Sequence, residues 1–248
     1  MNFNIVACIP ARYKSLRLPG KPLLKINDKT IINHVYDRVN QSTLIDMIYV
    51  LTDDERIEQE VLRFGGNCIM QNIECLNGTE RICKSLEFID NKYTIIVNIQ
   101  GDEPFIDPLN IDKCISNFIQ NNYNNFVCAT LHTKITHEEA EKTSIGKLVL
   151  DCHNNIMYCS RVPIPSTKLG KINKNINYYG HIGLFVFNRH YLENHYMEKN
   201  YHCQLSEDIE WLKIIESGNK INSTQVDFNE ISVDTVEDYN YLVAKYSA

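Results

Sequence analysis

The sequence predicts an α/β protein with a mainly parallel central sheet, helices on both faces and an inserted hairpin region. The first hundred residues alternate between short apolar runs, rich in Ile and Val, and segments in which apolar side chains recur every three or four positions. This alternation is typical of parallel strands joined by helices. After about residue 126 the alternation ends, and apolar runs follow one another across turns. We therefore expect a single domain, residues 1–248, with an inserted region at roughly 126–190.

Four apolar runs in the first hundred residues predict the parallel strands. They are Phe3–Pro10, Met47–Leu51, Asn67–Met70 and Tyr93–Ile99. Helices are expected between them, at residues 31–39, 52–64 and about 77–89, each with a stripe of apolar side chains. Thr30 is a candidate cap for the first helix, and Gly65-Gly66 ends the second. Because the connections are helical, the carboxyl ends of these strands should meet at one edge of the sheet.

The second half of the chain mixes strands, turns and shorter helices. The expected strands are Phe126–Leu131, Lys147–Leu150, Met157–Ser160, Ile182–Phe187 and Ile231–Asp234, and the expected helices are Leu109–Gln120, Glu207–Glu216 and one that begins at Thr235. Asp151–Asn155 is rich in turn formers and predicts a hairpin. Lys168–Tyr179 is rich in Asn and Lys, which predicts a mobile loop. Thr235 and Asp238 have the spacing of a capping box.

Composition narrows the partners and the compartment. The net charge is −6 and the isoelectric point is about 5.8, so neither a nucleic acid nor an anionic membrane is expected as a partner. Nine scattered cysteines without a CxxC pair indicate neither a disulfide framework nor a zinc site. No signal peptide or transmembrane run is recognisable. These features predict a cytoplasmic protein in a reducing compartment.

A basic loop follows the first predicted strand. Arg12, Lys14, Arg17 and Lys21 lie within ten residues, around Pro19-Gly20. Four cations this close repel one another unless an anion lies among them, so the loop predicts a phosphate site. It has neither Walker A nor GxGxxG spacing, which argues against a nicotinamide dehydrogenase. The alternative is a solvated loop whose cations pair with neighbouring acids.

Acidic residues follow two of the predicted strands. Asp102 follows Tyr93–Ile99 and should lie at the same sheet edge as the basic loop. Mg²⁺ prefers one or two carboxylates together with phosphate oxygens and water, so Asp102 is a candidate ligand, with a turn or capping role as the alternative. Asp234 closes another expected strand and fits a metal site or the N-cap of the last helix equally well.

Three motifs together resemble the 3-deoxy-manno-octulosonate (Kdo) cytidylyltransferase family. They are the loop IPARYKSLRLPGKPLL, the strand end VNIQGDEP and the late segment VDTVEDY, and the resemblance extends over nearly the whole chain. It implies a Rossmann-like nucleotidyltransferase fold and a homodimer formed through the inserted region. It also implies a magnesium-dependent enzyme whose partners are CTP and an acid sugar. The implied reaction transfers CMP from CTP to the anomeric hydroxyl of Kdo, with release of diphosphate, for lipopolysaccharide synthesis.

The resemblance further implies roles for individual residues. The CTP phosphates would be held by Arg12, Arg17 and Lys21, and the segment near the nucleotide would contain Thr79, Glu80 and Arg81. The magnesium ligands would be Asp102 and Asp234, which with Lys21 form the catalytic group. The acid sugar would be contacted by Gln100, Arg161, His181, Glu207 and Glu210. By pattern alone, Arg161, His181 and the two glutamates would be assigned structural or surface roles.

The expected chemistry is an in-line attack of an oxygen on the α-phosphorus. Positioning and charge neutralisation do most of the work in such reactions, so no dedicated side-chain base is expected. The sequence departs from the family pattern at Asn77, Gly180, Phe185, Phe187 and Val236. The changes at 180, 185 and 187 leave open a related keto acid, such as an amino-substituted Kdo or a nonulosonic acid.

Two alternatives from other classes are less favoured. A glycosyltransferase of similar fold would carry a DxD motif at a strand end, where this chain has Asp102-Glu103-Pro104. A non-catalytic nucleotide-binding module would not need acids at both Asp102 and Asp234.

Overall fold

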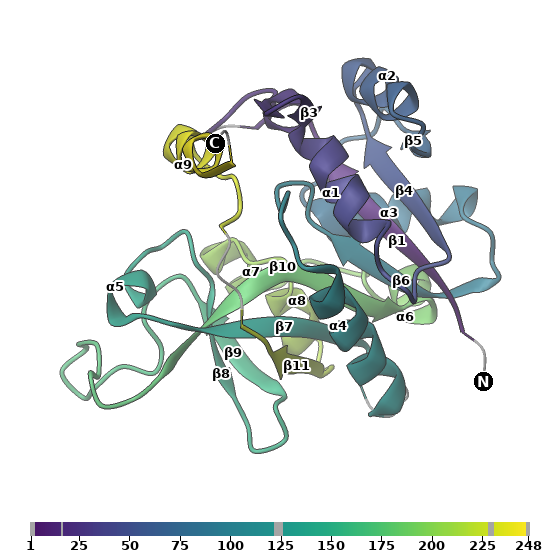
Figure 1. Ribbon diagram of the computed structural model, residues 1–248. Coiled ribbons are helices and arrows are strands. Elements are labelled where there is room, and N and C mark those ends of the chain that lie inside the picture. Colours follow the sequence, from purple (N-terminus) through teal and green to yellow (C-terminus); the bar gives the residue numbers. More distant parts are fainter. Residues whose placement is uncertain (1–2, 16, 122–125, 228–230, 247–248) are drawn as a thin grey trace. The chain divides into compact units, whose positions relative to one another are not determined.

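The computed structural model of this protein describes residues 3–15, 17–121, 126–227 and 231–246. The chain divides into two compact units, and each is described by itself. The first unit consists of residues 1–112 and 229–248, and the second of residues 113–228. Figure 1 labels the elements of both. The insertion expected at 126–190 lies within the second unit. In the described ranges, no helix is long and apolar enough to cross a membrane.

The first unit is built on parallel strands. These are β1 (Asn4–Ala11), β4 (Met47–Thr52), β5 (Cys68–Met70) and β6 (Tyr93–Ile99), in the order β6-β1-β4-β5. In β1, Val6 lies opposite Met47 of β4 on one side and Ile96 of β6 on the other. Side chains from Ile5 to Ile9 are buried, as expected of a strand covered on both faces. The four strands expected in this half of the chain are confirmed.

Capping residues fix the helices that connect these strands. α1 (Ile31–Val39), α2 (Glu55–Arg63) and α3 (Gly78–Ser85) begin after Thr30, Asp54 and Asn77. Each capping side chain accepts a hydrogen bond from a backbone N–H in the first helical turn, which satisfies a donor that the helix leaves free. α4 (Pro108–Gln120) spans the point at which the chain leaves the first unit.

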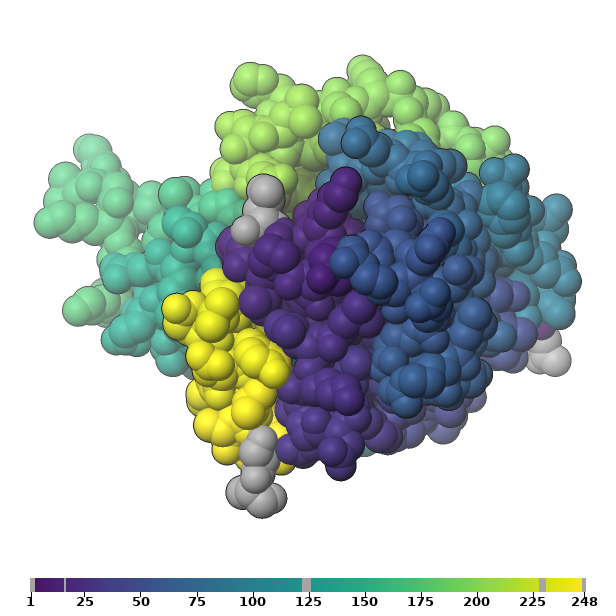
Figure 2. All heavy atoms as spheres, turned by 90° about the horizontal axis from the view of Figure 1, so that it is seen from above, coloured from purple at the N-terminus to yellow at the C-terminus, as the bar shows by residue number. Residues whose placement is uncertain are grey.

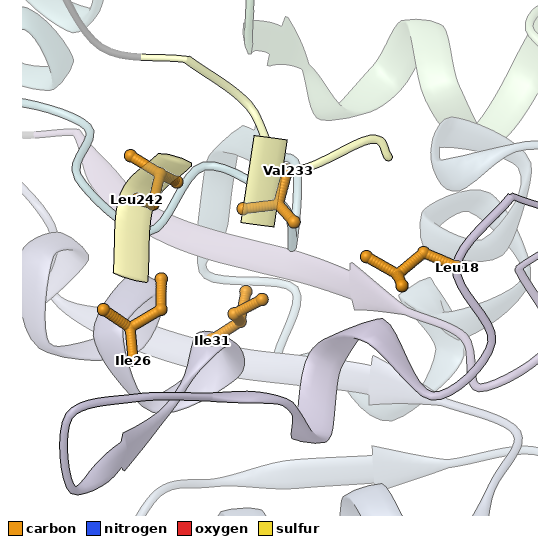
Figure 3. Packing of buried hydrophobic residues seen from close by; sticks show 5 residues of the cluster. All are labelled: Leu18, Ile26, Ile31, Val233 and Leu242. Atoms are coloured by element: carbon orange, nitrogen blue, oxygen red, sulfur yellow. The ribbon is translucent and has the colours of Figure 1, made fainter. Parts of the chain in front are cut away.

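The C-terminal segment returns to the first unit. α9 (Val236–Tyr246) packs against the small hairpin formed by β2 (Lys25–Ile26) and β3 (Lys29–Thr30), and Figure 2 shows this segment in yellow against the N-terminal residues in purple. Figure 3 shows the buried cluster that holds it: Leu18, Ile26, Ile31, Val233 and Leu242. The expected capping box is present, because Thr235 N–H donates to Asp238 (2.8 Å) and Asp238 N–H donates to the Thr235 hydroxyl (3.2 Å).

The second unit contains an antiparallel arrangement. β10 (Tyr178–Asn188) pairs with β7 (Cys128–Ile135) and β8 (Lys147–Leu150), and β8 forms a hairpin with β9 (Ile156–Ser160). β11 (Ile221–Gln225) lies parallel to β7. The helices are α5 (His137–Ala140), α6 (Arg189–Asn194), α7 (His202–Glu207) and α8 (Leu212–Glu216). The strands and the hairpin turn expected around residues 147–160 are confirmed.

Three expectations about local structure were wrong. The single helix expected at Glu207–Glu216 is two helices, α7 and α8, because Asp208 takes a left-handed conformation (φ 51°) that ends α7. Ile231–Asp234 forms no regular strand, although Val233 N–H donates to the carbonyl of Asp102 (2.9 Å). The loop expected to extend to Tyr179 ends earlier, because β10 begins at Tyr178.

Candidate functional site

The end of the basic loop after β1 returns to Tyr13. Tyr13 O accepts the N–H of Gly20 (2.9 Å), and Gly20 has a positive φ of 71°. A Cβ on Gly20 would meet the Tyr13 ring at 3.1 Å, so the turn favours glycine both by conformation and by space. Gly20 leads directly into the 3-10 turn Lys21–Leu23, which carries Lys21 inward. Arg12 and Lys14 are exposed on the loop.

Lys21 lies between two carboxylates. Its Nζ is 2.7 Å from Asp102 Oδ2 and 3.6 Å from Asp234 Oδ1, and Arg17 Nη2 lies 3.0 Å from the same Asp234 oxygen. Burial disfavours the charge on Lys21, but the attraction and hydrogen bond of Asp102, with the attraction of Asp234, outweigh it. The pKa of Lys21 is therefore raised above its usual value. The structure thus brings together two of the expected phosphate ligands and both expected metal ligands.

Two backbone contacts place these carboxylates. Gly101, just before Asp102, lies so near the end of β1 that a Cβ on it would be 2.8 Å from the carbonyl oxygen of Pro10. On the other side, Val233 N–H donates to Asp102 O, which brings the neighbouring Asp234 to the same place. Val233 belongs to the buried cluster of Figure 3, so the packing of the C-terminal segment holds Asp234 beside the basic loop.

The start of α3 carries a second polar group in the first unit. The Thr79 hydroxyl accepts from the Asn98 amide (3.0 Å), and Arg81 Nη2 donates to Asp53 (2.6 Å). Arg81 is 5% exposed and Asn98 is fully buried. Among the residues that the structure describes, Arg81 Nη1 and Asn98 Oδ1 have no hydrogen-bond partner. Buried donors and acceptors are nearly always paired, so this unpaired donor and acceptor suit a polar ligand.

Asp53 was not singled out by the sequence reasoning. It falls inside the helix expected at residues 52–64, but α2 begins at Glu55 and its cap is Asp54. The signal available was its position directly after β4, at the carboxyl edge of the parallel sheet. Glu80, by contrast, is occupied locally: its carboxylate accepts from Leu76 N–H (2.6 Å) and pairs with Lys84 (3.2 Å).

In the second unit, Arg161 and Glu207 are tied to the main chain. The Glu207 carboxylate accepts from the Ser160 hydroxyl (2.7 Å) and from Arg161 N–H (2.8 Å). The Arg161 guanidinium donates to the carbonyls of Ser144 (3.2 Å) and Asp208 (2.8 Å), and weakly to that of Glu207 (3.3 Å). In this arrangement Arg161 joins the turn before β8 to the end of α7.

His181 is held in one neutral form. The Thr130 hydroxyl donates its only hydrogen to Leu184 O (2.6 Å), so it must accept from His181 Nε2 (2.9 Å). That arrangement puts the proton on Nε2 and leaves Nδ1 with its lone pair. Burial, with smaller contributions from the nearby Arg161 and His132, lowers the pKa of His181 to about 3.

Two aromatic rings stack on the His181 imidazole. Trp211 lies 3.9 Å from it and Phe185 lies 4.8 Å from it, measured between ring centroids. Trp211 is not among the candidate site residues of the sequence, so its contact with His181 was missed. Glu210 lies between α7 and α8, and not one helical turn from Glu207 on a shared helix.

Comparison with known proteins decides the family. Residues 6–230 match the family model of the cytidylyltransferases. This chain belongs to the cytidylyltransferase family. The resemblance seen in the sequence motifs is therefore confirmed, and the protein is a cytidylyltransferase enzyme.

The relatives of this cytidylyltransferase span nearly its full length. It is 37% identical over 240 residues to 3-deoxy-manno-octulosonate cytidylyltransferase of Protochlamydia amoebophila, covering 96% of this chain and 92% of the relative. It is 36% identical to 8-amino-3,8-dideoxy-manno-octulosonate cytidylyltransferase of Shewanella woodyi, with 98% of both chains covered. A solved structure of CMP:2-keto-3-deoxy-manno-octonic acid synthetase with CTP matches with a TM-score of 0.90, 32% identity and 98% coverage of each chain. That match confirms the expected α/β nucleotidyltransferase fold.

Proposed function

We propose that this cytidylyltransferase transfers CMP from CTP to the anomeric hydroxyl of Kdo, releasing diphosphate. The observation that carries the proposal is the cluster of Lys21, Arg17, Asp102 and Asp234, in which cations suited to phosphate lie beside carboxylates suited to a divalent metal. Relatives with more than 90% mutual coverage bear this activity in their names. The product would serve lipopolysaccharide synthesis.

The nucleotide is proposed to bind along the carboxyl edge of β1, β4 and β6. The triphosphate is neutralised by Arg12, Arg17 and Lys21. Their largest contribution is to stabilise the negative charge that develops on the leaving diphosphate during transfer. The unpaired Nη1 of Arg81 is a donor suited to a carbonyl such as cytosine O2, and Asn98 Oδ1 is an acceptor suited to an amino group or hydroxyl.

Magnesium fits the donor set at Asp102 and Asp234. In the described part of the chain, no three His, Cys, Asp or Glu side chains converge on one point, so a metal here would take two carboxylates and complete its shell with phosphate oxygens and water. That is the pattern Mg²⁺ prefers. When bound, magnesium would offset negative charge on the phosphates and lower the pKa of a coordinated hydroxyl. Lys21 and Arg17 hold the two carboxylates in place until then.

Within the second unit, the acid sugar is proposed to contact Arg161, His181, Glu207 and Glu210. Gln100, which directly follows β6, stays a sugar contact proposed from the family resemblance alone. His181 is neutral at physiological pH, with its Nδ1 lone pair available to accept a hydroxyl hydrogen. It therefore contributes an acceptor and not a positive charge. No side-chain base is assigned, because in-line transfer of a phosphoryl group depends chiefly on positioning.

A diphosphate-release assay with CTP, Mg²⁺ and a panel of acid sugars tests the activity. We expect release with Kdo, and a loss of at least about a hundredfold in turnover for Asp102→Asn at saturating Mg²⁺. Unchanged turnover of Asp102→Asn would remove the metal assignment. No release with any acid sugar in the panel would remove the proposed reaction.

A second substrate is favoured by a specific observation. The relative from Shewanella woodyi is named for an 8-amino-3,8-dideoxy sugar and is almost as similar to this chain as the Kdo relatives. Gly180, Phe185 and Phe187, which depart from the motif pattern, flank His181 on β10. Mass analysis of the products from Kdo and 8-amino-Kdo in competition separates the two substrates.

A cytoplasmic homodimer is proposed on two grounds. Each of the nine cysteines is a free thiol, which suits a reducing compartment. Within the region 126–190, Met157, Val162 and Leu169 are exposed by 62%, 57% and 82%, which suits burial against a second copy. Light scattering after size-exclusion chromatography gives the mass, and a monomer at micromolar concentration would contradict the dimer.

A further inference from the structure

Lys147, the first residue of β8, is a buried cation that has no role in the proposed reaction. Its side chain is fully buried, and its Nζ lies 2.7 Å from Lys142 O, 2.7 Å from Ile145 O and 2.5 Å from Arg161 O. An ammonium has three hydrogens, and here all three go to main-chain carbonyls. Within the described residues, no carboxylate pairs with it. A buried charge of this kind is costly, so a less costly apolar residue would be expected unless the cation has a task.

The three carbonyls belong to Arg161, a candidate sugar ligand, and to a turn that contacts Arg161 and His181. Lys142 and Ile145 belong to the turn before β8, residues 142–146. In the same turn, Ser144 O accepts from the Arg161 guanidinium and Gly146 O accepts from His181 N–H (2.9 Å). The third carbonyl is that of Arg161 itself. One ammonium therefore links the main chain of Arg161 to the turn that holds both the Arg161 side chain and the His181 backbone.

Strand pairing places Lys147 between the same two residues. Its backbone lies opposite Gly180 of β10 and opposite Ser160 of β9, the immediate neighbours of His181 and Arg161. Ser160 in turn donates to Glu207, so a third candidate sugar ligand joins the same network.

The charge of this network is unbalanced. Lys147 and Arg161 supply two positive charges and Glu207 supplies one negative charge. Burial, followed by repulsion from Arg161, lowers the pKa of Lys147 to about 8, and Glu207 acts in the opposite direction. A net positive charge among partly buried groups is stabilised by an incoming carboxylate, which is the group that distinguishes an acid sugar from a neutral one.

We propose that Lys147 is a positioning residue for the acid sugar, whose buried ammonium fixes the turn 142–146 and the main chain of Arg161 so that Arg161 and His181 are held ready for the sugar. The inference rests on the proposed function, because it assigns a task to the same sugar-binding group. It adds a residue that does not touch the substrate and acts through Arg161 and His181.

The test is a comparison of the KM values for the two substrates. Lys147→Met removes the ammonium with little loss of volume, and Lys147→Gln keeps two N–H donors for the carbonyls. For each variant, KM for the acid sugar and KM for CTP are measured well below the melting temperature. We expect the sugar KM of Lys147→Met to rise at least about tenfold and that of Lys147→Gln to rise less, but by more than about twofold. The CTP KM should stay within about twofold of wild type.

The matched control is Arg189→Leu. Arg189 is another buried cation of the second unit, 6% exposed and paired with Glu193 at 2.6 Å, and it lies beyond the opposite end of β10 from His181. Its loss should lower stability without changing the sugar KM. If Lys147→Met does not fold, Lys147→Gln carries the same comparison.

Two results overturn the proposal. One is a folded Lys147 variant whose sugar KM stays within about twofold of wild type. The other is a rise in the sugar KM that Arg189→Leu reproduces at equal loss of stability. Either result is distinct from failure of the proposed function, in which the wild-type enzyme itself turns over no acid sugar.

Discussion

Gly101→Ala is expected to damage turnover far more than stability. Gly101 lies between β6 and Asp102, and a Cβ there would be 2.8 Å from the carbonyl oxygen of Pro10 in β1. That oxygen is part of a central strand and has no flexible end that could swing away. The added methyl must therefore push the segment containing Asp102 outward.

The size of the displacement follows from the contact distance. Ordinary van der Waals contact begins at 3.4 Å, so the segment must move by about 0.6 Å. The Asp102–Lys21 contact is 2.7 Å, and a shift of this size weakens it and moves a candidate metal ligand. Misplacement on the ångström scale can cost about a hundredfold in rate, so we expect kcat to fall about 10- to 100-fold. Overpacking of this kind typically costs about 1–3 kcal/mol of stability.

The assay is diphosphate release at saturating CTP, acid sugar and Mg²⁺, together with the melting temperature. Gly218→Ala is the matched control: it makes the same chemical change in open space at a positive φ of 83°, with an expected loss of about 1 kcal/mol. The control should melt a few degrees lower and keep wild-type kcat. A Gly101→Ala enzyme with wild-type kcat would refute the close-contact reasoning, as would a Gly218→Ala enzyme that loses activity equally.

Three further predictions concern charge and packing. Lys21→Met should lower the free energy of unfolding by about 1–3 kcal/mol, because it removes the ion-pair partner of Asp102 and leaves Asp234 paired with Arg17 alone. Since the pKa of Lys21 is raised in the folded state, the difference in unfolding free energy between wild type and variant should be greatest below pH 10.5. It should shrink as the pH rises through the folded pKa. A difference that grows in alkali would contradict the ion pair. His181 should stay neutral from pH 8 to pH 5 in NMR titrations. Because its pKa falls to about 3 on folding, its contribution to stability should decline as the pH drops below 6.5. An imidazole that titrates near pH 6.5 would contradict its buried, stacked setting. Leu242→Ala should cost about 2–5 kcal/mol in urea unfolding and should weaken turnover in the surviving folded protein, because Leu242 packs in the cluster that holds the segment of Asp234. Undiminished stability would show that α9 does not anchor that segment.

The sequence contained enough to predict the first unit almost completely. Runs of Ile and Val in β1 and β6 identify strands that are covered on both faces. The short polar side chains of Thr30 and of the pair Thr235 and Asp238 identify the starts of helices. Helical crossovers then leave few topologies, so the meeting of the basic loop with Asp102 follows from connectivity. The residues of this cluster could be named before any coordinates were known.

The second unit was less predictable because tertiary contacts override local pattern there. Asp208 ends a helix that periodicity would continue, and no sequence signal requires its left-handed conformation. Arg161 looked like a surface arginine, yet its guanidinium is drawn to main-chain carbonyls supplied by distant segments. Lys147 looked like an ordinary strand residue. Its burial is possible because three main-chain carbonyls accept from its ammonium. Every residue has such a carbonyl, so the sequence does not show which ones will surround a lysine.

The first unit is assembled from two stretches of chain, residues 1–112 and 229–248, and its two candidate metal ligands come from different stretches. Because synthesis proceeds from the N-terminus, Lys21 and Asp102 are made long before Asp234, with the whole second unit translated in between. A product of premature termination before residue 234 therefore carries the basic loop but only one of the two carboxylates. Under the proposed metal assignment, the metal site is therefore completed only when the C-terminal stretch has been made.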